Sequence, residues 1–341
     1  MSHESELRAT IAAITAPGKG ILAADESTPT ITKRFNGVGI ESTPQTRRAY
    51  RLLLSNAPDA DRYLSGVILY EETLEQADDA GVPLPKVLEQ RGIVPGIKVD
   101  KGTTPLPNAD GDLITQGLDG LGERLAGYRT QGARFAKWRE VYPITDRNPT
   151  RLGSRANAEV LARYAAICQS EGVVPIVEPE VLIDGDHSLE RCAEVTDAVL
   201  HAVFAALYRH RVLLEGMVLK PNMVLPGNKF AGGKAAPDVV AKATLDVLKR
   251  NVPAAVPTIN FLSGGQAPEE ATANLNAMNR LEPNAPWVLS FSYARALQDP
   301  VMRAWSGNAG NVARAQQIFD HRLRMNSLAR QGKWTEAEER A

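Results

Sequence analysis

Lys220 ends a short apolar run, and this position makes its amine a candidate nucleophile. Residues 217–219 are Met, Val and Leu, and Pro221 follows the lysine, so the run predicts a buried strand that stops at Lys220. A buried ammonium loses hydration unless it is paired with an anion or gives up its proton, and a neutral amine attacks carbonyl carbons. Lys220 is therefore a candidate for Schiff-base chemistry. The alternative is a lysine whose ammonium reaches solvent from the strand end.

Ionisable residues follow four other apolar runs in the same way. Each of these residues alone could be an ordinary solvated charge of a loop. Five such run ends in one chain favour a shared polar cluster, in which neighbouring cations would destabilise the ammonium form of each lysine. The residues concerned, besides Lys220, are Asp25, Glu26, Lys98, Asp100, Lys137, Arg139, Glu178 and Glu180.

Two further run ends carry residues that suit an anion. Ser263, Gly264 and Gly265 follow an apolar run and precede a helical pattern that begins at Glu269. Glycines let backbone N–H groups approach an anion, and a helix N-terminus adds its dipole. Arg295 follows the last apolar run, where a guanidinium suits phosphate. The alternatives are a plain Gly-Gly turn and a surface arginine.

The segment after the first apolar run is a second candidate for anion binding. Residues 26–34 contain hydroxyl groups that can cap a helix, Pro29 near its first position, and the cations Lys33 and Arg34. Such a segment suits a second phosphate. A capped helix with solvated basic residues is an equally good interpretation.

The elements that must position these residues alternate along the chain. Short apolar runs favour β structure, and helical patterns such as 158–169 lie between most of them. Starts about 40 residues apart fit βα units, and eight units fit one (β/α)8 TIM barrel, whose active site lies at the carboxyl ends of its strands. We expect a single α/β domain over residues 1–341, with additional N- and C-terminal helices and a short tail at about 333–341. The predicted strands are 21–24, 66–70, 93–99, 133–138, 173–178, 217–220, 257–262 and 287–292.

Composition excludes several classes of function. The 341 residues are 43% hydrophobic and 23% charged with a net charge of −1, which describes a globular protein and implies neither a nucleic-acid nor a membrane partner. The first residues lack a basic region followed by an apolar stretch, and no apolar run approaches the roughly 18 residues that span a bilayer. We therefore expect a cytoplasmic protein.

Cysteine and histidine usage argues against redox and metal chemistry. Cys168 and Cys192 lie in helical patterns and fit buried reduced thiols better than a disulfide. The histidines are scattered without metal-ligand spacing. Residues 18–23 match the dinucleotide pattern G-x-G-x-x-A, but the glycines precede a strand instead of following one. We expect neither a metal nor a cofactor.

Six motifs in order resemble class I fructose-bisphosphate aldolase. They are GILAADES (20–27), GIKVDKG (96–102), FAKWR (135–139), PIVEPE (175–180), LKPNMV (219–224) and FLSGGQ (261–266), and the likeness extends from about residue 7 to residue 333. Because several long motifs occur in the same order along the chain, the resemblance is highly specific. It implies a metal-free enzyme that reversibly cleaves fructose 1,6-bisphosphate to dihydroxyacetone phosphate and glyceraldehyde 3-phosphate.

The resemblance also implies catalytic roles. Lys220 matches the Schiff-base lysine, which forms an iminium with the ketose C2. Glu178 resembles the acid/base that dehydrates the carbinolamine, and Asp25 resembles a carboxylate placed for the C4 hydroxyl proton. Lys137 resembles a lysine that stabilises charge beside Lys220. Glu180, together with Lys98, fits the supporting ionic network.

Both anion-binding segments match substrate-binding positions of the family. One phosphate end is implied for Ser263, Gly264, Gly265, Ser292, Ala294 and Arg295, and the other for Ser27, Thr30, Lys33, Arg34, Lys98 and Arg139. Thr30 stands where serine is frequent, and Ala294 stands where glycine is frequent. Alanine would strain the backbone if position 294 required a positive φ.

A departure from the resemblance occurs near the C-terminus. Eukaryotic members of the family end in a tail whose terminal tyrosine assists proton exchange on the enamine, whereas the last tyrosine here is Tyr293. We expect covalent binding and C–C cleavage to persist, with protonation of the enamine slowed or assigned to another group. The resemblance further implies a homotetramer.

Three hypotheses follow. The first is the aldolase just described. The second is another Schiff-base barrel that acts on a different phosphosugar, which the presence of two anion-binding segments opposes, although preference between bisphosphate and 1-phosphate stays open. The third is a non-catalytic phosphosugar-binding or scaffold protein, which the retained Asp25, Lys137, Glu178 and Lys220 oppose.

Overall fold

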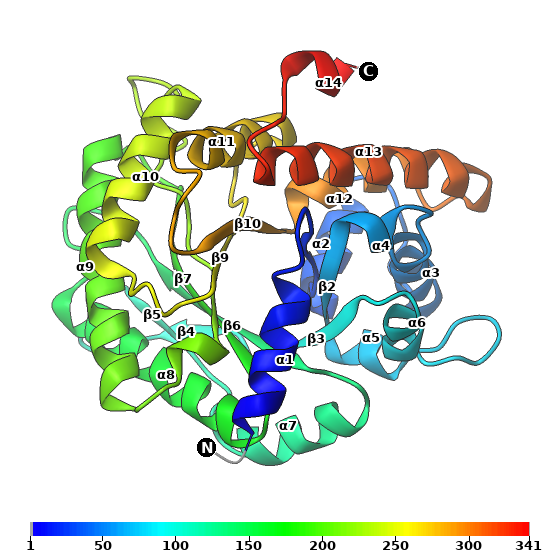
Figure 1. The fold of residues 1–341 in the computed structure, drawn as a ribbon, viewed down its shortest axis with the longest axis horizontal. Coiled ribbons are helices and arrows are strands. Elements are labelled where there is room, and N and C mark those ends of the chain that lie inside the picture. The colour runs from blue at the N-terminus through cyan, green and yellow to red at the C-terminus, as the bar shows by residue number, and fades with distance from the viewer. Residues whose placement is uncertain (1–2, 341) are drawn as a thin grey trace.

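Eight parallel strands close into a barrel in the computed structural model, which describes residues 3–340 (Figure 1). Around the barrel the strands follow the order β1, β10, β9, β8, β7, β6, β3, β2, and β2 pairs again with β1. This arrangement confirms the predicted TIM barrel. The strands are β1 (Gly20–Ala24), β2 (Leu64–Leu69), β3 (Val94–Lys98), β6 (Phe135–Tyr142), β7 (Val174–Val181), β8 (Val218–Leu219), β9 (Thr258–Phe261) and β10 (Val288–Tyr293).

Helices surround the barrel and connect its strands (Figure 1). Their apolar residues recur at helical spacing and face the strands, as do Leu161, Ala165 and Cys168 of α8. Thr150 caps α8 by accepting a hydrogen bond from the Gly153 N–H. The helices are α2 (Thr28–Asn36), α3 (Pro44–Ser55), α4 (Ala60–Tyr63), α5 (Glu71–Glu75), α6 (Leu84–Gln90), α7 (Leu121–Thr130), α8 (Arg151–Ser170), α9 (Leu189–Arg209), η1 (Leu214–Gly216), α10 (Pro237–Asn251), α11 (Pro268–Leu281), α12 (Arg295–Trp305) and η2 (Ala309–Asn311).

Three helices are additional to the βα units, as expected for the two ends of the chain. They are α1 (Glu4–Ile14), α13 (Val312–Arg330) and α14 (Glu336–Arg340). The buried side chains of α1, which include Leu7 and Ile11, belong to one apolar cluster with Ile21, Ile68 and Val174 of the strands. The helix α1 therefore covers the amino ends of the strands and leaves their carboxyl ends open.

The strands are buried on both faces, because their outer side chains meet helices and their inner side chains fill the barrel. All six residues of β2 are buried. Such burial explains why the strands appear in the sequence as continuous apolar runs instead of alternating patterns. Inside the barrel, Gly96 leaves room for the Phe135 ring, since a Cβ at this position would lie 2.2 Å from that ring.

One element was not predicted. A hairpin of β4 (Thr103–Pro105) and β5 (Leu113–Thr115) lies between β3 and α7 in the chain, and its two strands pair in antiparallel fashion. The hairpin is tied to the barrel because Thr115 Oγ1 donates a hydrogen bond of 2.7 Å to the Arg139 carbonyl. It thus borders the carboxyl end of β6.

Residues 333–340 pack against the barrel's outer helices. The Trp334 N–H donates to Asn276 of α11 at 3.0 Å, and its indole N–H donates to Glu339 at 2.9 Å. Arg324 of α13 pairs with Glu338 at 2.9 Å. These contacts hold α14 beside α11 and α13.

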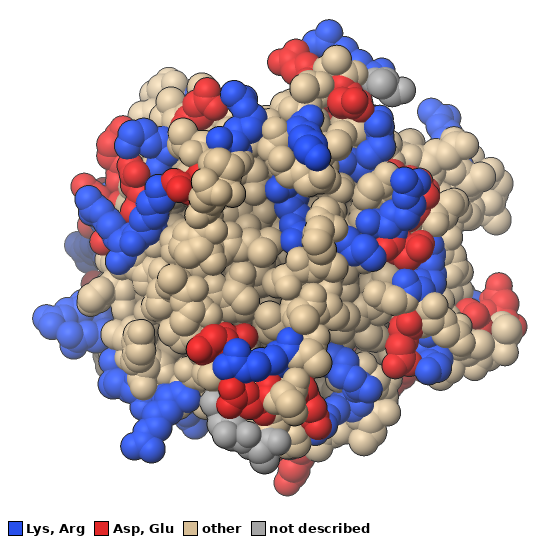
Figure 2. Space-filling view, viewed as in Figure 1, with Lys and Arg blue, Asp and Glu red and all other residues tan. Residues whose placement is uncertain are grey.

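The surface carries charges of both signs. Figure 2 shows Lys and Arg side chains interspersed with Asp and Glu, mostly around the margin of the face that it displays, with a largely uncharged area in the middle. None of the helices within residues 3–340 is long and apolar enough to cross a membrane.

Candidate active site

A cavity of about 380 Å³ lies at the carboxyl ends of the barrel strands and collects most of the predicted site residues. Every predicted residue except Lys33 and Gly265 lines it. The lining residues that the sequence predicted are Asp25, Ser27, Thr30, Arg34, Lys98, Lys137, Arg139, Glu178, Glu180, Lys220, Ser263, Gly264, Ser292, Ala294 and Arg295.

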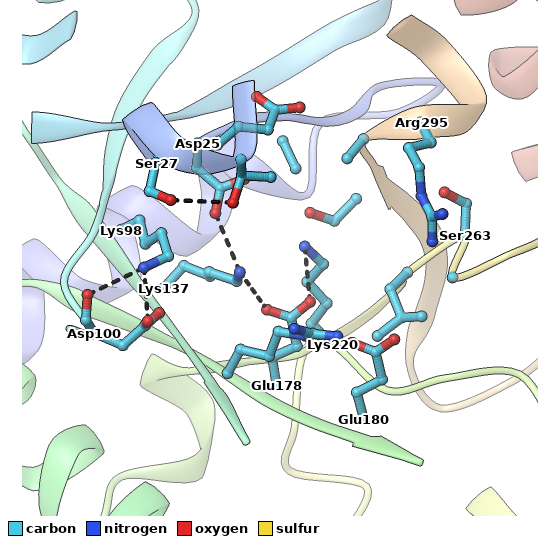
Figure 3. A pocket seen from close by; sticks show the side chains of 18 of the residues that line it. Asp25, Ser27, Lys98, Asp100, Lys137, Glu178, Glu180, Lys220, Ser263 and Arg295 are labelled. Carbon is cyan, nitrogen blue, oxygen red and sulfur yellow. Dashed lines mark hydrogen bonds and ion pairs between the residues drawn. The ribbon is translucent and has the colours of Figure 1, made fainter. Parts of the chain in front are cut away.

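Four buried side chains form a row of alternating charge at the bottom of the cavity (Figure 3). Lys137 Nζ lies 3.1 Å from Asp25 Oδ2 and 2.9 Å from Glu178 Oε2, and Lys220 Nζ lies 3.2 Å from Glu178 Oε1. The contact between Lys137 and Glu178 is an ion pair whose angles do not make a hydrogen bond. The row therefore runs Asp25, Lys137, Glu178, Lys220.

The charges in this row shift one another's protonation. Burial alone would raise the pKa of Asp25, but the ammonium groups of Lys137, Lys220 and Lys98 outweigh burial and lower this pKa to about 2. Burial opposes the charged form of Lys137, yet Asp25 and Glu178 raise its pKa above the usual range. Asp25 is consequently a carboxylate and Lys137 an ammonium at neutral pH.

Lys220 comes to the row from the strand end that the sequence predicted. Its backbone N–H donates to the Val177 carbonyl at 2.8 Å, which continues the pairing of β8 with β7, and Pro221 then ends the strand. The side chain is 3% exposed. The sequence predicted that neighbouring cations would destabilise the ammonium form of Lys220. In the structure the Glu178 carboxylate lies between Lys220 and Lys137 and contacts both amines.

A second pair of strand-end residues supports the first. Arg139 Nε lies 2.5 Å from Glu180 Oε2. Burial would raise the pKa of Glu180, but Arg139 outweighs burial and lowers it. On β3, Lys98 Nζ pairs with Asp100 Oδ1 at 2.6 Å.

One side of the cavity presents Ser292 and Arg295. Ser292 Oγ is buried and makes no hydrogen bond to a described residue. Figure 3 shows the Arg295 guanidinium beside Ser263, and no dashed line joins it to another of the side chains drawn there. Ala294 precedes the first residue of α12 with a φ of −105°, so alanine is not strained there as a positive φ would have required. Ser263 and Gly264 complete this side.

The opposite side presents cations that are already paired. Ser27 and Thr30 share a hydrogen bond of 3.1 Å between their hydroxyl oxygens. The Arg34 guanidinium contacts Glu26 and lies 2.7 Å from Asp299. An anion bound on this side must therefore compete with carboxylates for Arg34.

Two predicted residues lie outside the lining. Lys33 is an exposed residue of α2, on a different face of the helix from Arg34. Gly265 has a φ of +74°, and a Cβ there would lie 2.6 Å from Ile183, so this glycine packs against a loop beside the cavity. The structure thus brings together the two sides of the cavity without these two residues.

Several lining residues had no catalytic or substrate-binding role assigned from the sequence, although Glu26 and Asp100 were placed in the predicted polar cluster. Glu26 pairs with both Arg34 and Arg51, and Asp100 pairs with Lys98. Their signal was present, since both are charged and follow predicted strands. Gly102 and Thr103 reach the cavity from the β4–β5 hairpin, which had no sequence signal.

The two cysteines lie outside this site. Burial raises the pKa of both thiols, so neither is poised to act as a thiolate. Within residues 3–340, no group of three or more histidine, cysteine or carboxylate side chains is arranged to hold a metal ion.

Comparison with known proteins gives one consistent result. The family model "Fructose-bisphosphate aldolase class-I" matches residues 6–341. The cytoplasmic isozyme of fructose-bisphosphate aldolase from Spinacia oleracea is 54% identical over 332 residues, which cover 97% of this chain and 92% of that protein. Fructose-bisphosphate aldolase C from Rattus norvegicus is 54% identical over 322 residues, covering 94% and 88%.

A solved structure agrees over the same length. It is that of fructose-bisphosphate aldolase from Plasmodium falciparum, in complex with TRAP and a small-molecule inhibitor. The two folds match with a TM-score of 0.95 and 50% identity over 97% of this chain and 95% of that one. The chain belongs to the class I fructose-bisphosphate aldolases, a family of metal-independent lyases.

Proposed function

We propose that Lys220 carries the aldolase reaction by forming an iminium with C2 of fructose 1,6-bisphosphate. The observation that supports this proposal is the row Asp25, Lys137, Glu178, Lys220, in which a buried amine lies 3.2 Å from a carboxylate that can take its proton. Groups within hydrogen-bond reach can exchange protons during catalysis.

Imine formation uses Lys220 and Glu178. Glu178 accepts a proton from the Lys220 ammonium, and the neutral amine then attacks C2 to give a carbinolamine. Glu178 returns the proton to the carbinolamine hydroxyl, which leaves as water, and the C2=N iminium remains. Lys137, 2.9 Å from Glu178, stabilises the ionised carboxylate and the developing negative charge on the substrate oxygen.

Cleavage uses Asp25 and the iminium. Asp25 accepts the proton of the C4 hydroxyl, the C3–C4 bond breaks, and its electron pair moves into the iminium to give an enamine. Glyceraldehyde 3-phosphate leaves as the aldehyde. Protonation of the enamine carbon and hydrolysis of the imine then release dihydroxyacetone phosphate and restore Lys220.

The order of the strands supports a proposed assignment of the two phosphates. The strands β8, β9 and β10 are neighbours in the barrel, and they lead to Lys220, Ser263 and Arg295 respectively. Since C1 is bonded to C2, the 1-phosphate falls on the side of Ser263 and Arg295. The 6-phosphate then falls on the side of β1, β3 and β6, where Ser27, Thr30, Lys98 and Arg139 lie. Both ends of a bisphosphate are thereby accommodated.

Borohydride trapping tests the assignment of Lys220. The enzyme is reduced in the presence of dihydroxyacetone phosphate and its peptides are mapped by mass spectrometry, with K220M as the matched variant and with a chelator present throughout. We expect label on Lys220 in the wild-type enzyme and none in K220M. Label on Lys137 instead, or loss of activity on chelation, would refute the assignment.

The oligomeric state and the location of the protein are further proposals. We propose a homotetramer in the cytoplasm, which the family resemblance supports. Relatives from Spinacia oleracea and Arabidopsis thaliana are named as cytoplasmic and cytosolic forms. Fractionation of the native host would test the location, since recovery with a membrane or organelle fraction would contradict it.

A further inference from the structure

The strand that carries the two site glutamates is much longer than its neighbour on the Lys220 side. Strand β7 extends to Val181, whereas β8 comprises Val218 and Leu219. Their last paired residues are Val177 and Leu219, followed by the bond from the Lys220 N–H to the Val177 carbonyl. Pro221 has no N–H to continue the ladder. The end of β7 therefore needs another contact on this side.

The side chain of Asn222 provides that contact. Its Oδ1 accepts a hydrogen bond of 3.0 Å from the Val181 N–H. Its Nδ2 donates to Thr196 Oγ1 at 3.2 Å and to the Met223 carbonyl at 3.1 Å. Asn222 is 5% exposed, so these bonds are shielded from water. The amide is thus fixed in one orientation between β7 and α9.

The same short segment also contacts the anion-binding side of the cavity. The Pro221 carbonyl accepts a hydrogen bond of 3.1 Å from the Leu262 N–H, which lies directly before Ser263. Residues 220–222 therefore connect the Lys220 nucleophile both to strand β7, which carries Glu178 and Glu180, and to the segment that leads into Ser263. Of these connections, the one to the end of β7 depends on a side chain, and so it can be removed by mutation.

We propose that Asn222 is a positioning residue for imine formation: by bonding Val181 it holds the end of β7 against residue 220 and sets the separation between Lys220 and Glu178. Proton transfer between these groups requires hydrogen-bond distance, and a displacement of about 1 Å can slow a reaction about 100-fold. The inference rests on the proposed roles of Lys220 and Glu178.

Truncation of Asn222 tests the proposal. The rate of borohydride-trappable imine formation with dihydroxyacetone phosphate is compared with the Kd for a hexitol 1,6-bisphosphate, which has no carbonyl and cannot form an imine. In N222A we expect imine formation to slow about 10-fold or more, with the Kd within about 3-fold of wild type. An unchanged imine rate, or a Kd that weakens as much as the rate, would overturn the proposal.

Asn260 offers a matched control. It is also buried and bridges two strands, since its Nδ2 donates to the Phe291 carbonyl at 3.2 Å, but these strands are β9 and β10 and not the strand β7 that carries Glu178. The variant N260A should therefore lose stability without slowing imine formation. If N260A slows imine formation as strongly as N222A does, the effect is general loosening of the barrel and the proposal fails.

A second variant decides the matter if N222A does not fold. T196V removes the hydroxyl that accepts a hydrogen bond from the Asn222 amide, so the amide is held less firmly and its bond to the Val181 N–H weakens. We expect imine formation about 3-fold slower with an unchanged Kd, and a wild-type rate would overturn the proposal. Absence of any trapped imine in the wild-type enzyme would instead refute the proposed role of Lys220, so the two failures are distinguishable.

Discussion

At the scale of single residues, charge alternates along the row from Asp25 to Lys220, so replacing any one of its residues leaves a neighbouring charge without its partner. Each charge is buried, and each lies beside a charge of opposite sign. Removing one partner of a buried pair costs about 3–5 kcal/mol, because the other charge is left without compensation. Conservative replacements are therefore the informative ones.

Replacing Asp25 by asparagine should separate cleavage from imine formation. D25N cannot accept the C4 hydroxyl proton, so we expect single-turnover cleavage to slow by about 10²- to 10⁴-fold. Trapping of dihydroxyacetone phosphate on Lys220 should persist, since Glu178 stays in place. D100N, the same change in the same cavity but outside the row, should spare cleavage. Equal losses of cleavage and trapping in D25N would contradict the assigned role.

Ser292 should contribute to binding and not to stability. Its hydroxyl is buried and has no hydrogen-bond partner among the described residues, so it is available to bind a phosphate. In S292A we expect KM for the bisphosphate to rise about 10-fold, while Tm stays the same or rises because no hydrogen bond of the folded protein is lost. Ser290 is the control, because its hydroxyl donates to the Lys19 carbonyl at 3.1 Å. S290A should lower Tm and leave KM unchanged. The opposite pattern would remove Ser292 from the phosphate site.

Sequence patterns predicted most of the residues in the cavity, and the exceptions have physical causes. A charged residue after a buried strand must emerge at the carboxyl end of the barrel, so Lys220 and Glu178 could be predicted. The sequence could not exclude Lys33 from the site, because adjacent residues of a helix point in directions about 100° apart and the sequence does not show which of Lys33 and Arg34 faces the cavity. The pairing of Arg34 with Glu26 and Asp299 depends on a contact between distant parts of the chain.

At the scale of elements, the eight barrel strands were predicted and the hairpin was not. Burial on both faces makes the barrel strands continuous apolar runs, as in β2. The strands β4 and β5 are three residues each and largely unburied, so no apolar period marks them. Strand ends shifted by a few residues, as in β6, which continues to Tyr142 because β7 pairs with it over its whole length.

The hairpin is held by a carboxyl group whose ionisation should destabilise the fold. Glu140 is fully buried on β6 and accepts hydrogen bonds from the Thr115 N–H at 3.1 Å and from the Trp138 indole at 2.9 Å. Burial raises the pKa of Glu140 from 4.5 to about 7, although these donors act in the opposite direction. Between about pH 4.5 and pH 7, the folded protein therefore keeps a proton on Glu140 that the unfolded chain has already released.

Stability should accordingly fall as pH rises through that window. The loss through this one group is on the order of 3 kcal/mol, and it is complete above the folded pKa. E140Q cannot ionise, so its free energy of unfolding should lack this decline relative to wild type. Urea unfolding at fixed protein concentration between pH 5 and pH 8 measures the difference. Parallel profiles for the two proteins would show that Glu140 is not the group responsible.

At the scale of the whole molecule, the barrel is closed at one end and open at the other. The helix α1 packs its apolar side chains against the barrel interior at the amino ends of the strands, and the cavity lies at the carboxyl ends. Substrate access and chain packing therefore do not compete for the same face. The face displayed in Figure 2 carries both positive and negative side chains. Attraction between a positive surface of one chain and a negative surface of another would therefore not drive assembly through this face.

Assembly itself can be measured directly. If the proposed homotetramer forms, sedimentation equilibrium should give four times the chain mass of 36.9 kDa, and the mass should not vary over micromolar concentrations. Catalysis per chain should be the same at each concentration, because one chain already supplies the row from Asp25 to Lys220 and both anion-binding sides of the cavity. A mass equal to one chain would refute the tetramer and leave the assignment of the active site untouched.

The opposition of α1 and the cavity gives a rule for attaching the enzyme to a surface. Ala9 is an exposed residue of α1, while Cys168 and Cys192 are both buried. An A9C variant would therefore present the one accessible thiol among the described residues, and maleimide coupling there would attach each chain at the closed end of its barrel, away from the cavity. Such a film should keep its activity per molecule, whereas random coupling through lysines would modify the cavity as well.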